Sequence, residues 1–261
     1  MNFSSIVFCL VRGPLLAAFV MLSATGGQLS AASSKDPSDA QVEIDVRSYV
    51  DERWEGVRKR GPIEHGKVYL IASVNESPSA QKLLQPVDNE GLLRQFRQTL
   101  TSHGFREALE GDTPDVVLTV LYGRGFVRNP YLANIDGDID APSIVPTPAE
   151  SLRAAAIKPS LYQDRLWGRY EQKVIKAQKE KLFIRVTAWK FPDHAQEKPV
   201  ELWKTTMVVD EPDQNDLNQL YPQMLAAGAS FFDRPMKTEE VTVSKPLKEG
   251  NVEVGPVKVI E

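Results

Sequence analysis

The stretch with the most polar chemistry is 122–140, YGRGFVRNPYLANIDGDID. Three aspartates alternate within it: Asp136, Asp138 and Asp140. Hard carboxylate oxygens suit Ca²⁺, which would offset the repulsion between them. The EF-hand pattern fails, because Ala141 stands where its sixth-position glycine is required and Thr147 where its closing glutamate is required. Two interpretations stay open, a calcium loop of another type and a solvated acidic loop.

Two arginines of the same stretch, Arg124 and Arg128, are candidates for gripping an anion through paired N–H groups. The run 123–125 begins like the phosphate-binding turn G-x-G-x-x-G. However, Arg128 occupies the third glycine position and no helical pattern follows. A dinucleotide site is therefore not expected. The choice for these arginines is between an anion site and a solvated rim at a strand end.

Aromatic side chains gather later, around the strand-like run 182–191, LFIRVTAWKF. Alternation places Phe183, Arg185, Trp189 and Phe191 on one strand face. Such a face either packs under a helix or stays exposed to a glycan or protein partner. Trp189 is the candidate ligand-binding residue if the face is exposed.

Motifs for other chemistries are missing from the sequence. The three histidines lie far apart, with no HExxH motif and no cysteine beside them, so zinc is not expected. No G-x-S-x-G motif is present either. We assign no catalytic residue, and we expect no cofactor unless calcium binds the acidic stretch. The sequence favours a protein that is not an enzyme.

The N-terminus reads as a secretory signal peptide over 1–31, followed by a linker over 32–41. Arg12 precedes an apolar run at 15–24, and small residues follow at 30–32. A retained anchor is the alternative, but the run is too short to span about 30 Å of hydrocarbon. We therefore expect a periplasmic or secreted protein with no transmembrane span after cleavage. Its formal net charge of −4 argues against nucleic acid as a partner.

Helical and strand-like periods mix along 42–235, which predicts one α+β domain, a two-layer mixed β-sheet with helices packed on one face. Strands are expected at 42–46, 67–74, 114–126, 182–191 and 200–210. Helices are expected at 88–104, at 164–181 and from Leu220 onward, with Pro222 in the first turn of the last helix. A Pro-rich excursion fills 129–160, and the tail at 236–261 forms an edge hairpin or stays loose.

Several phrases of this unit resemble the bacterial envelope family catalogued as domain of unknown function 4136. They include KVYLIASV, TPDVVLTVLYG and LYPQMLAAGASFF, and the resemblance covers about Val42 to Arg234. The resemblance implies an exported, non-enzymatic protein and transfers no site residues. The chain departs from the family in two ways. Members are often lipoproteins, whereas Cys9 precedes the apolar run, and the Pro-rich excursion is long.

These observations predict an exported cell-envelope protein that binds or scaffolds an envelope protein or a glycan. The alternative is a calcium-dependent hydrolase or carbohydrate-binding protein that uses the acidic loop at 134–140. A broad apolar or aromatic patch would favour the first function, and a deep pocket with perturbed acids would favour the second.

Overall fold

The computed structural model describes residues 41–60, 66–132, 144–145, 147, 149, 157–166, 168–192, 198–210 and 216–247. The chain divides into two units, Met1–Lys35 and Asp36–Glu261, and every described residue belongs to the second. The expected signal peptide and the three aspartates of the acidic loop therefore lie outside the described residues.

The strands are β1 (Gln41–Val50), β2 (Val68–Glu76), β3 (Arg106–Glu107), β4 (Val116–Val127), β5 (Ile144–Val145), β6 (Lys181–Lys190), β7 (Glu201–Asp210) and β8 (Val241–Pro246). The helices are α1 (Glu52–Arg60), α2 (Asn89–Ser102), α4 (Pro159–Leu166), α5 (Tyr170–Ala177) and α6 (Leu217–Gly228), followed by a 3₁₀ turn, η2 (Ala229–Phe231).

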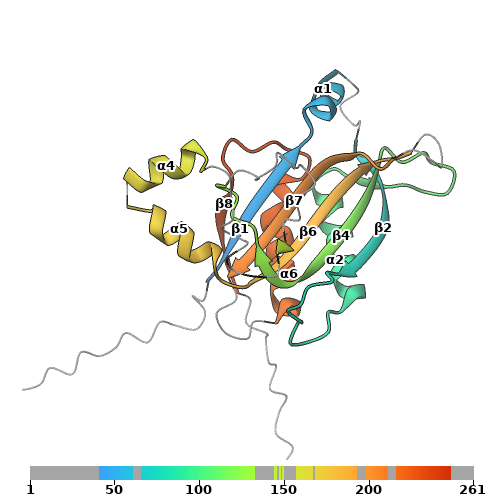
Figure 1. Ribbon diagram of the computed structural model, residues 1–261. Coiled ribbons are helices and arrows are strands. Elements are labelled where there is room, and N and C mark those ends of the chain that lie inside the picture. The colour runs from blue at the N-terminus through green and yellow to red at the C-terminus, as the bar shows by residue number, and fades with distance from the viewer. Residues whose placement is uncertain are drawn as a thin grey trace, which may run out of the picture. The chain divides into compact units, whose positions relative to one another are not determined.

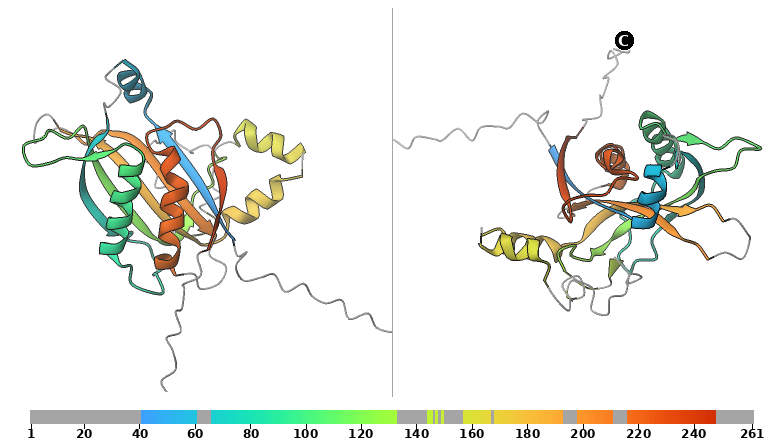
Figure 2. Two further views of the ribbon diagram at one scale, coloured as in Figure 1. Left: turned by 180° about the vertical axis from the view of Figure 1, so that it is seen from behind. Right: turned by 90° about the horizontal axis from the view of Figure 1, so that it is seen from above.

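One mixed sheet organises the domain, in the order β3-β2-β4-β6-β7-β1-β8, with β5 paired to β4 beside this path. β2 pairs in parallel with β3 and with β4, and the other pairs are antiparallel. Two helices, α2 and α6, cover one face of the sheet (Figures 1 and 2). The predicted α+β class is therefore confirmed.

The β2–α2–β4 unit follows directly from its sequence. Asp88 caps α2 by accepting a hydrogen bond from the Gly91 N–H at 3.0 Å. Gly104 has φ of +79°, the left-handed conformation in which glycine commonly ends a helix. The connection returns the chain to the sheet, and β2 and β4 pair in parallel as strand, helix, strand predicts.

The main core lies between the sheet and the pair α2 and α6. The Trp203 and Phe232 rings stack with centroids 5.7 Å apart, and Phe96 meets Phe232 edge-on at 6.1 Å. All three side chains are buried. Aromatic pairs of this geometry add stability beyond their buried area, so β7, α2 and the end of α6 are fixed to one another.

Two expected elements differ in detail, and a third is described in part. The helix expected over 164–181 is two helices, α4 and α5, because the chain turns at Gly168, which has φ of +74°. The last helix begins at Leu217, not near Leu220, since Asp216 caps it by accepting from the Asn218 N–H at 2.9 Å. The described part of the tail is one edge strand, β8, antiparallel to β1.

Candidate functional site

The sheet face opposite α2 and α6 is the face turned to the viewer in Figure 1, where no helix lies in front of β2, β4 and β6. Alternation directs every second residue of each strand to this side. We call this surface the open face. It carries Tyr49, Leu70, Val117, Thr119, Leu121, Arg185, Thr187, Trp189, Lys204 and Thr206, which stand in register across β1, β2, β4, β6 and β7.

One end of this sheet side is covered. Val127, Phe183 and Val208 form a second buried cluster there, against which Leu121 packs. β5 pairs with the end of β4 in the same region. Toward the other end, Tyr49 and Leu70 are 47% and 42% exposed. The open face therefore carries both apolar and polar side chains, and it borders a region of the sheet that is covered.

Trp189 lies on the open face with its indole held in place. Its Nε1 donates a hydrogen bond to the Thr119 hydroxyl at 3.0 Å. Trp189 pairs with Val117 across the strands, so Thr119 is two positions further along β4. The bond therefore holds the indole against the sheet, and the residue keeps partial exposure. A ring fixed in this way is a preorganised aromatic contact surface.

Arg185 lies on the same strand, four residues before Trp189. Its Nε donates to the Thr206 hydroxyl at 3.3 Å, whereas Nη2 is buried and has no acceptor in the described part of the chain. Burial lowers the pKa of Arg185 to about 10, although the charge of Glu201 raises it and that of Arg47 lowers it further. The guanidinium still carries its charge at neutral pH. A buried donor without an acceptor costs free energy, so Arg185 can still donate a hydrogen bond to a ligand.

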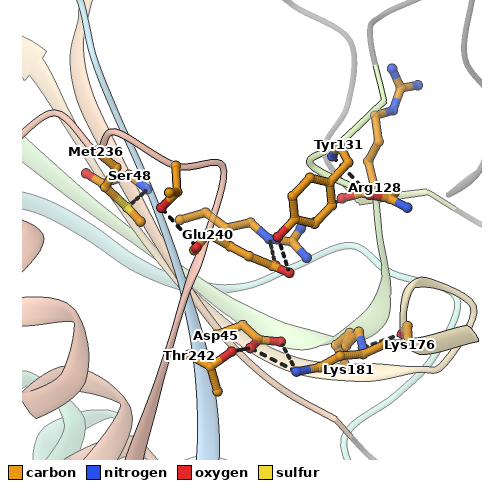
Figure 3. Close-up of polar contacts among 12 residues, drawn as sticks. Asp45, Ser48, Arg128, Tyr131, Lys176, Lys181, Met236, Glu240 and Thr242 are labelled. Carbon is orange, nitrogen blue, oxygen red and sulfur yellow. Dashed lines mark hydrogen bonds and ion pairs between the residues drawn. The ribbon is translucent and has the colours of Figure 1, made fainter. Parts of the chain in front are cut away.

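A second group of polar side chains joins β1, β6, β7, α5, β8 and the turn after β4; we call it the polar cluster (Figure 3). It comprises Asp45, Arg47, Tyr131, Lys176, Lys181, Asp210, Glu240 and Thr242. Asp45 accepts from Thr242 at 2.7 Å and pairs with Lys176 at 2.7 Å. Glu240 pairs with Arg47 at 3.2 Å and accepts from the Tyr131 hydroxyl at 3.2 Å.

The two lysines of the polar cluster shift in opposite directions. Burial lowers the pKa of Lys176, but the hydrogen bond and charge of Asp45, with Asp210 and Glu240, raise it more, so its net pKa lies above the usual lysine value. Burial dominates for Lys181 and lowers its pKa despite the contact with Asp210. The cavity among these residues has a volume of only about 10 Å³, near the minimum for one water molecule. The polar cluster therefore connects neighbouring segments of the fold, and its described residues enclose no space for a substrate.

The structure separates the residues that the sequence analysis selected. Arg124 pairs with Glu180, with Nε at 2.8 Å and Nη2 at 2.6 Å from one carboxylate oxygen. The Arg128 carbonyl accepts from Arg47 Nη1 at 2.8 Å, beside the polar cluster. Trp189 pairs with Val117, seven residues of β4 away from Arg124, which is about 23 Å of strand. Arg124 and Trp189 therefore do not share a site.

Arg185 and its threonine neighbours were not selected as a site from the sequence. The alternation of the run 182–191 does place Arg185 and Trp189 on one face, and the structure confirms that placement. Thr119 and Thr206 come from other strands, so only the strand register could reveal them. The aspartates at 136, 138 and 140 lie outside the described residues.

Within the described ranges, no three His, Cys, Asp or Glu side chains are grouped to hold a metal ion. No helix in the described part of the chain is both long and apolar enough to span a bilayer.

The chain was compared with family models, curated proteins and solved structures. No family model matches it, and no curated protein does. Among solved structures, a PelC dodecamer from Paraburkholderia phytofirmans is 10% identical, with 74% of this chain and 99% of that chain covered and a TM-score of 0.34. A DUF4136 family protein from Bacteroides thetaiotaomicron is 10% identical, with 71% and 93% covered and a TM-score of 0.35. Its family is the one that the sequence phrases resemble.

Proposed function

We propose that this chain is an exported cell-envelope protein that acts as a non-enzymatic binding module, and that the open face is its binding surface. One observation carries the proposal. A charged arginine with an unpaired donor shares a partly exposed, aromatic sheet face with the fixed indole of Trp189. Aromatic residues and arginine are the side chains that most often dominate binding surfaces.

Export rests on the N-terminal pattern of one charge, a short apolar run and small residues. The partner is an envelope protein or a glycan, and no cofactor is part of the proposal. The alternative, a calcium-dependent hydrolase or carbohydrate-binding protein, depends on 134–140, outside the described residues.

Site-specific photo-crosslinking in the native cells tests the binding surface. A benzoylphenylalanine replaces Tyr49 on the open face or, as a matched control, Tyr162 on α4; these tyrosines are 47% and 57% exposed. We expect an adduct from position 49 that is weaker or missing at position 162. Equal adducts from both positions, or none from position 49, would contradict the assignment of the open face.

Mass spectrometry of the protein from the native cells tests export. We expect the mature N-terminus to fall between Gln28 and Ser34, in the small-residue segment that follows the apolar run. A mature chain that begins at Met1 would refute cleavage.

A further inference from the structure

We propose that the ligand of the open face is a carboxylate-bearing glycan, such as a chain of uronate sugars, with its carboxylate at Arg185 and a sugar ring on the indole of Trp189. This inference rests on the function proposed above and names the chemical class of its partner.

The charge of the open face points to an anion. Lys204 on this face is already paired with Glu201 at 2.7 Å, and the neighbouring Arg47 is paired with Glu240 at 3.2 Å. Arg185 differs, because its one hydrogen bond is to the neutral hydroxyl of Thr206. Its charge therefore has no contacting carboxylate in the described part of the chain.

A ligand carboxylate matches what Arg185 lacks. The two terminal nitrogens of a guanidinium can donate together to one carboxylate, and charge-assisted bonds of this kind are strong. Arg185 is mostly covered but keeps some exposure on the open face, and a ligand would reach the guanidinium through that exposed part. Resonance holds the Nε–Cζ bond planar, so the covered Nη2 would reach the same carboxylate by rotation about the Cδ–Nε bond, which gives up the 3.3 Å hydrogen bond to Thr206. Binding then supplies an acceptor for a donor that otherwise has none.

The remainder of the open face suits a sugar. The negative face of a fixed indole attracts the weakly positive C–H groups on one side of a sugar ring. Thr119 and Thr187 are directly opposite each other, and Thr187 is flanked on its other side by Lys204. Thr187 is itself buried, so the Thr119 hydroxyl and the Lys204 ammonium group offer the hydrogen bonds to sugar hydroxyls. Apolar contact with a few polar groups is the usual composition of a ligand site.

An acidic peptide fits this surface less well. Extended peptides commonly bind a sheet by adding a strand to its edge, through main-chain hydrogen bonds. Arg185 and Trp189 are on β6, which is an interior strand paired with β4 on one side and β7 on the other. Its main-chain groups are therefore already used, and only side chains are available for recognition.

The spacing of the two contacts sets the ligand length. Thr119, under the indole, is on β4, and Thr206, which holds Arg185, is two strands away on β7. Two strand spacings amount to about 10 Å, and the offset of two residues along β6 adds about 7 Å in the perpendicular direction. The carboxylate and the stacked ring therefore belong to different sugars of one chain.

Calorimetry on the mature chain with tetragalacturonate tests the inference, with the carboxyl-reduced neutral tetramer and a tetraglutamate peptide as matched probes. Of the three probes, we expect only tetragalacturonate to bind. Arg185→Gln should weaken that binding about tenfold or more, in line with the loss of a charge-assisted pair. Arg185→Lys keeps the charge without the fork and should also weaken binding. Trp189→Ala should abolish stacking, whereas Trp189→Phe should retain part of it. Arg97→Gln, an exposed position of α2 on the other side of the sheet, is the control and should bind as wild type.

Three results would overturn the inference: no uronate binding, equal binding of the neutral tetramer, or tighter binding of tetraglutamate. Circular dichroism identifies any variant that does not fold; should Arg185→Gln be one, Arg185→Lys and the two Trp189 variants decide the matter. A protein adduct from position 49 in cells, combined with no uronate binding by the purified chain, would refute the glycan while the proposed function stands.

Discussion

Lys181 is the most deeply buried charge of the polar cluster, with 1% of its side chain exposed, and it contacts Asp210, whose side chain is 26% exposed. The two partners are therefore unequal. Without Asp210, a buried ammonium loses its counter-charge, whereas without Lys181 a carboxylate near solvent is left. Removing one partner of a buried pair is strongly destabilising because the remaining charge is left buried and unpaired, and this penalty is smaller when the remaining charge is a carboxylate near solvent.

We predict that Asp210→Asn lowers the free energy of unfolding by about 3 kcal/mol, because Asp45 compensates only part of the charge of Lys181. Lys181→Met should change it by less than about 1 kcal/mol, since it removes the desolvation cost together with the charge. Urea unfolding of both variants measures the difference. Equal losses would show that the pair itself stabilises the fold.

Lys176 gives a prediction about pH. Burial lowers its pKa, but Asp45 and the other carboxylates raise it more, so its folded-state pKa exceeds the unfolded value of 10.5. A raised lysine pKa contributes stability that is complete below the unfolded value and is lost as the pH rises through the folded value. Lys176→Met lacks this contribution. The stability difference between wild type and Lys176→Met should therefore shrink as the pH rises from about 10 to about 12; a difference that stays constant in urea unfolding over this range would contradict the assignment.

At the scale of elements, Phe96 fixes α2 to the core. Its side chain is fully buried and meets Phe232 edge-on. We predict that Phe96→Ala costs about 3–5 kcal/mol, through lost burial and a cavity. Gln98→Ala is the matched control, because Gln98 is exposed on the same helix and alanine favours helix. Thermal melting of the two variants checks this, and similar melting temperatures would refute the packing of α2.

The approach of α6 to β7 depends on a glycine. A Cβ at Gly228 would lie 2.0 Å from Met207 Sδ and 2.7 Å from its Cγ. Met207 is fully buried on β7, so it has little room to withdraw. We predict that Gly228→Ala costs about 1–3 kcal/mol by overpacking.

A double-mutant cycle identifies the cause of that cost. If Met207 is the obstacle, Met207→Ala should cost less in the Gly228→Ala background than in wild type, because the new methyl group fills part of the cavity. Additive costs in denaturant unfolding would place the strain elsewhere.

At the scale of the whole molecule, β8 closes one edge of the sheet. It pairs with β1 from Gln41 to Val46 and carries Thr242, while Glu240 immediately precedes it. Truncation after Arg234 would remove this ladder and leave Asp45 and Arg47 without those partners. We predict a melting temperature lower by about 6–12 °C, which corresponds to roughly 3 kcal/mol for a domain of this size. Truncation after Leu247 keeps every described pair and is the control; equal melting of the two truncated chains would contradict a role for β8.

The acidic loop gives a second prediction at this scale. Its aspartates lack the EF-hand spacing, so we expect millimolar Ca²⁺ to leave the melting temperature unchanged, since a ligand stabilises only by binding the native state. A rise in melting temperature that disappears in a variant with Asp136→Asn and Asp138→Asn would favour the calcium-dependent alternative over the binding module.

The sequence by itself determined the elements, because local periodicity and capping depend on near neighbours. The apolar spacing of α2 with Asp88 before it, and the alternation of β4 and β6, were enough to predict their type and the α+β class. The prediction from sequence was wrong where a single residue changes the local backbone or provides a helix cap. Gly168 divides the expected helix into α4 and α5, and the Asp216 cap starts α6 before Pro222.

Only the tertiary structure decided the candidate site. Alternation placed Arg185 and Trp189 on one face, but did not say which face the helices cover or which residues stand opposite. Thr119 and Thr206 become neighbours of these residues through strand pairing across 70 and 21 residues of chain. Likewise, Arg124 and Arg128 are close in sequence, yet Arg124 pairs with Glu180, whereas the Arg128 carbonyl accepts from Arg47 of the polar cluster. The physical reason is that a binding surface depends on register and burial, which arise when distant segments pack, whereas a helix or strand is already encoded in its own span.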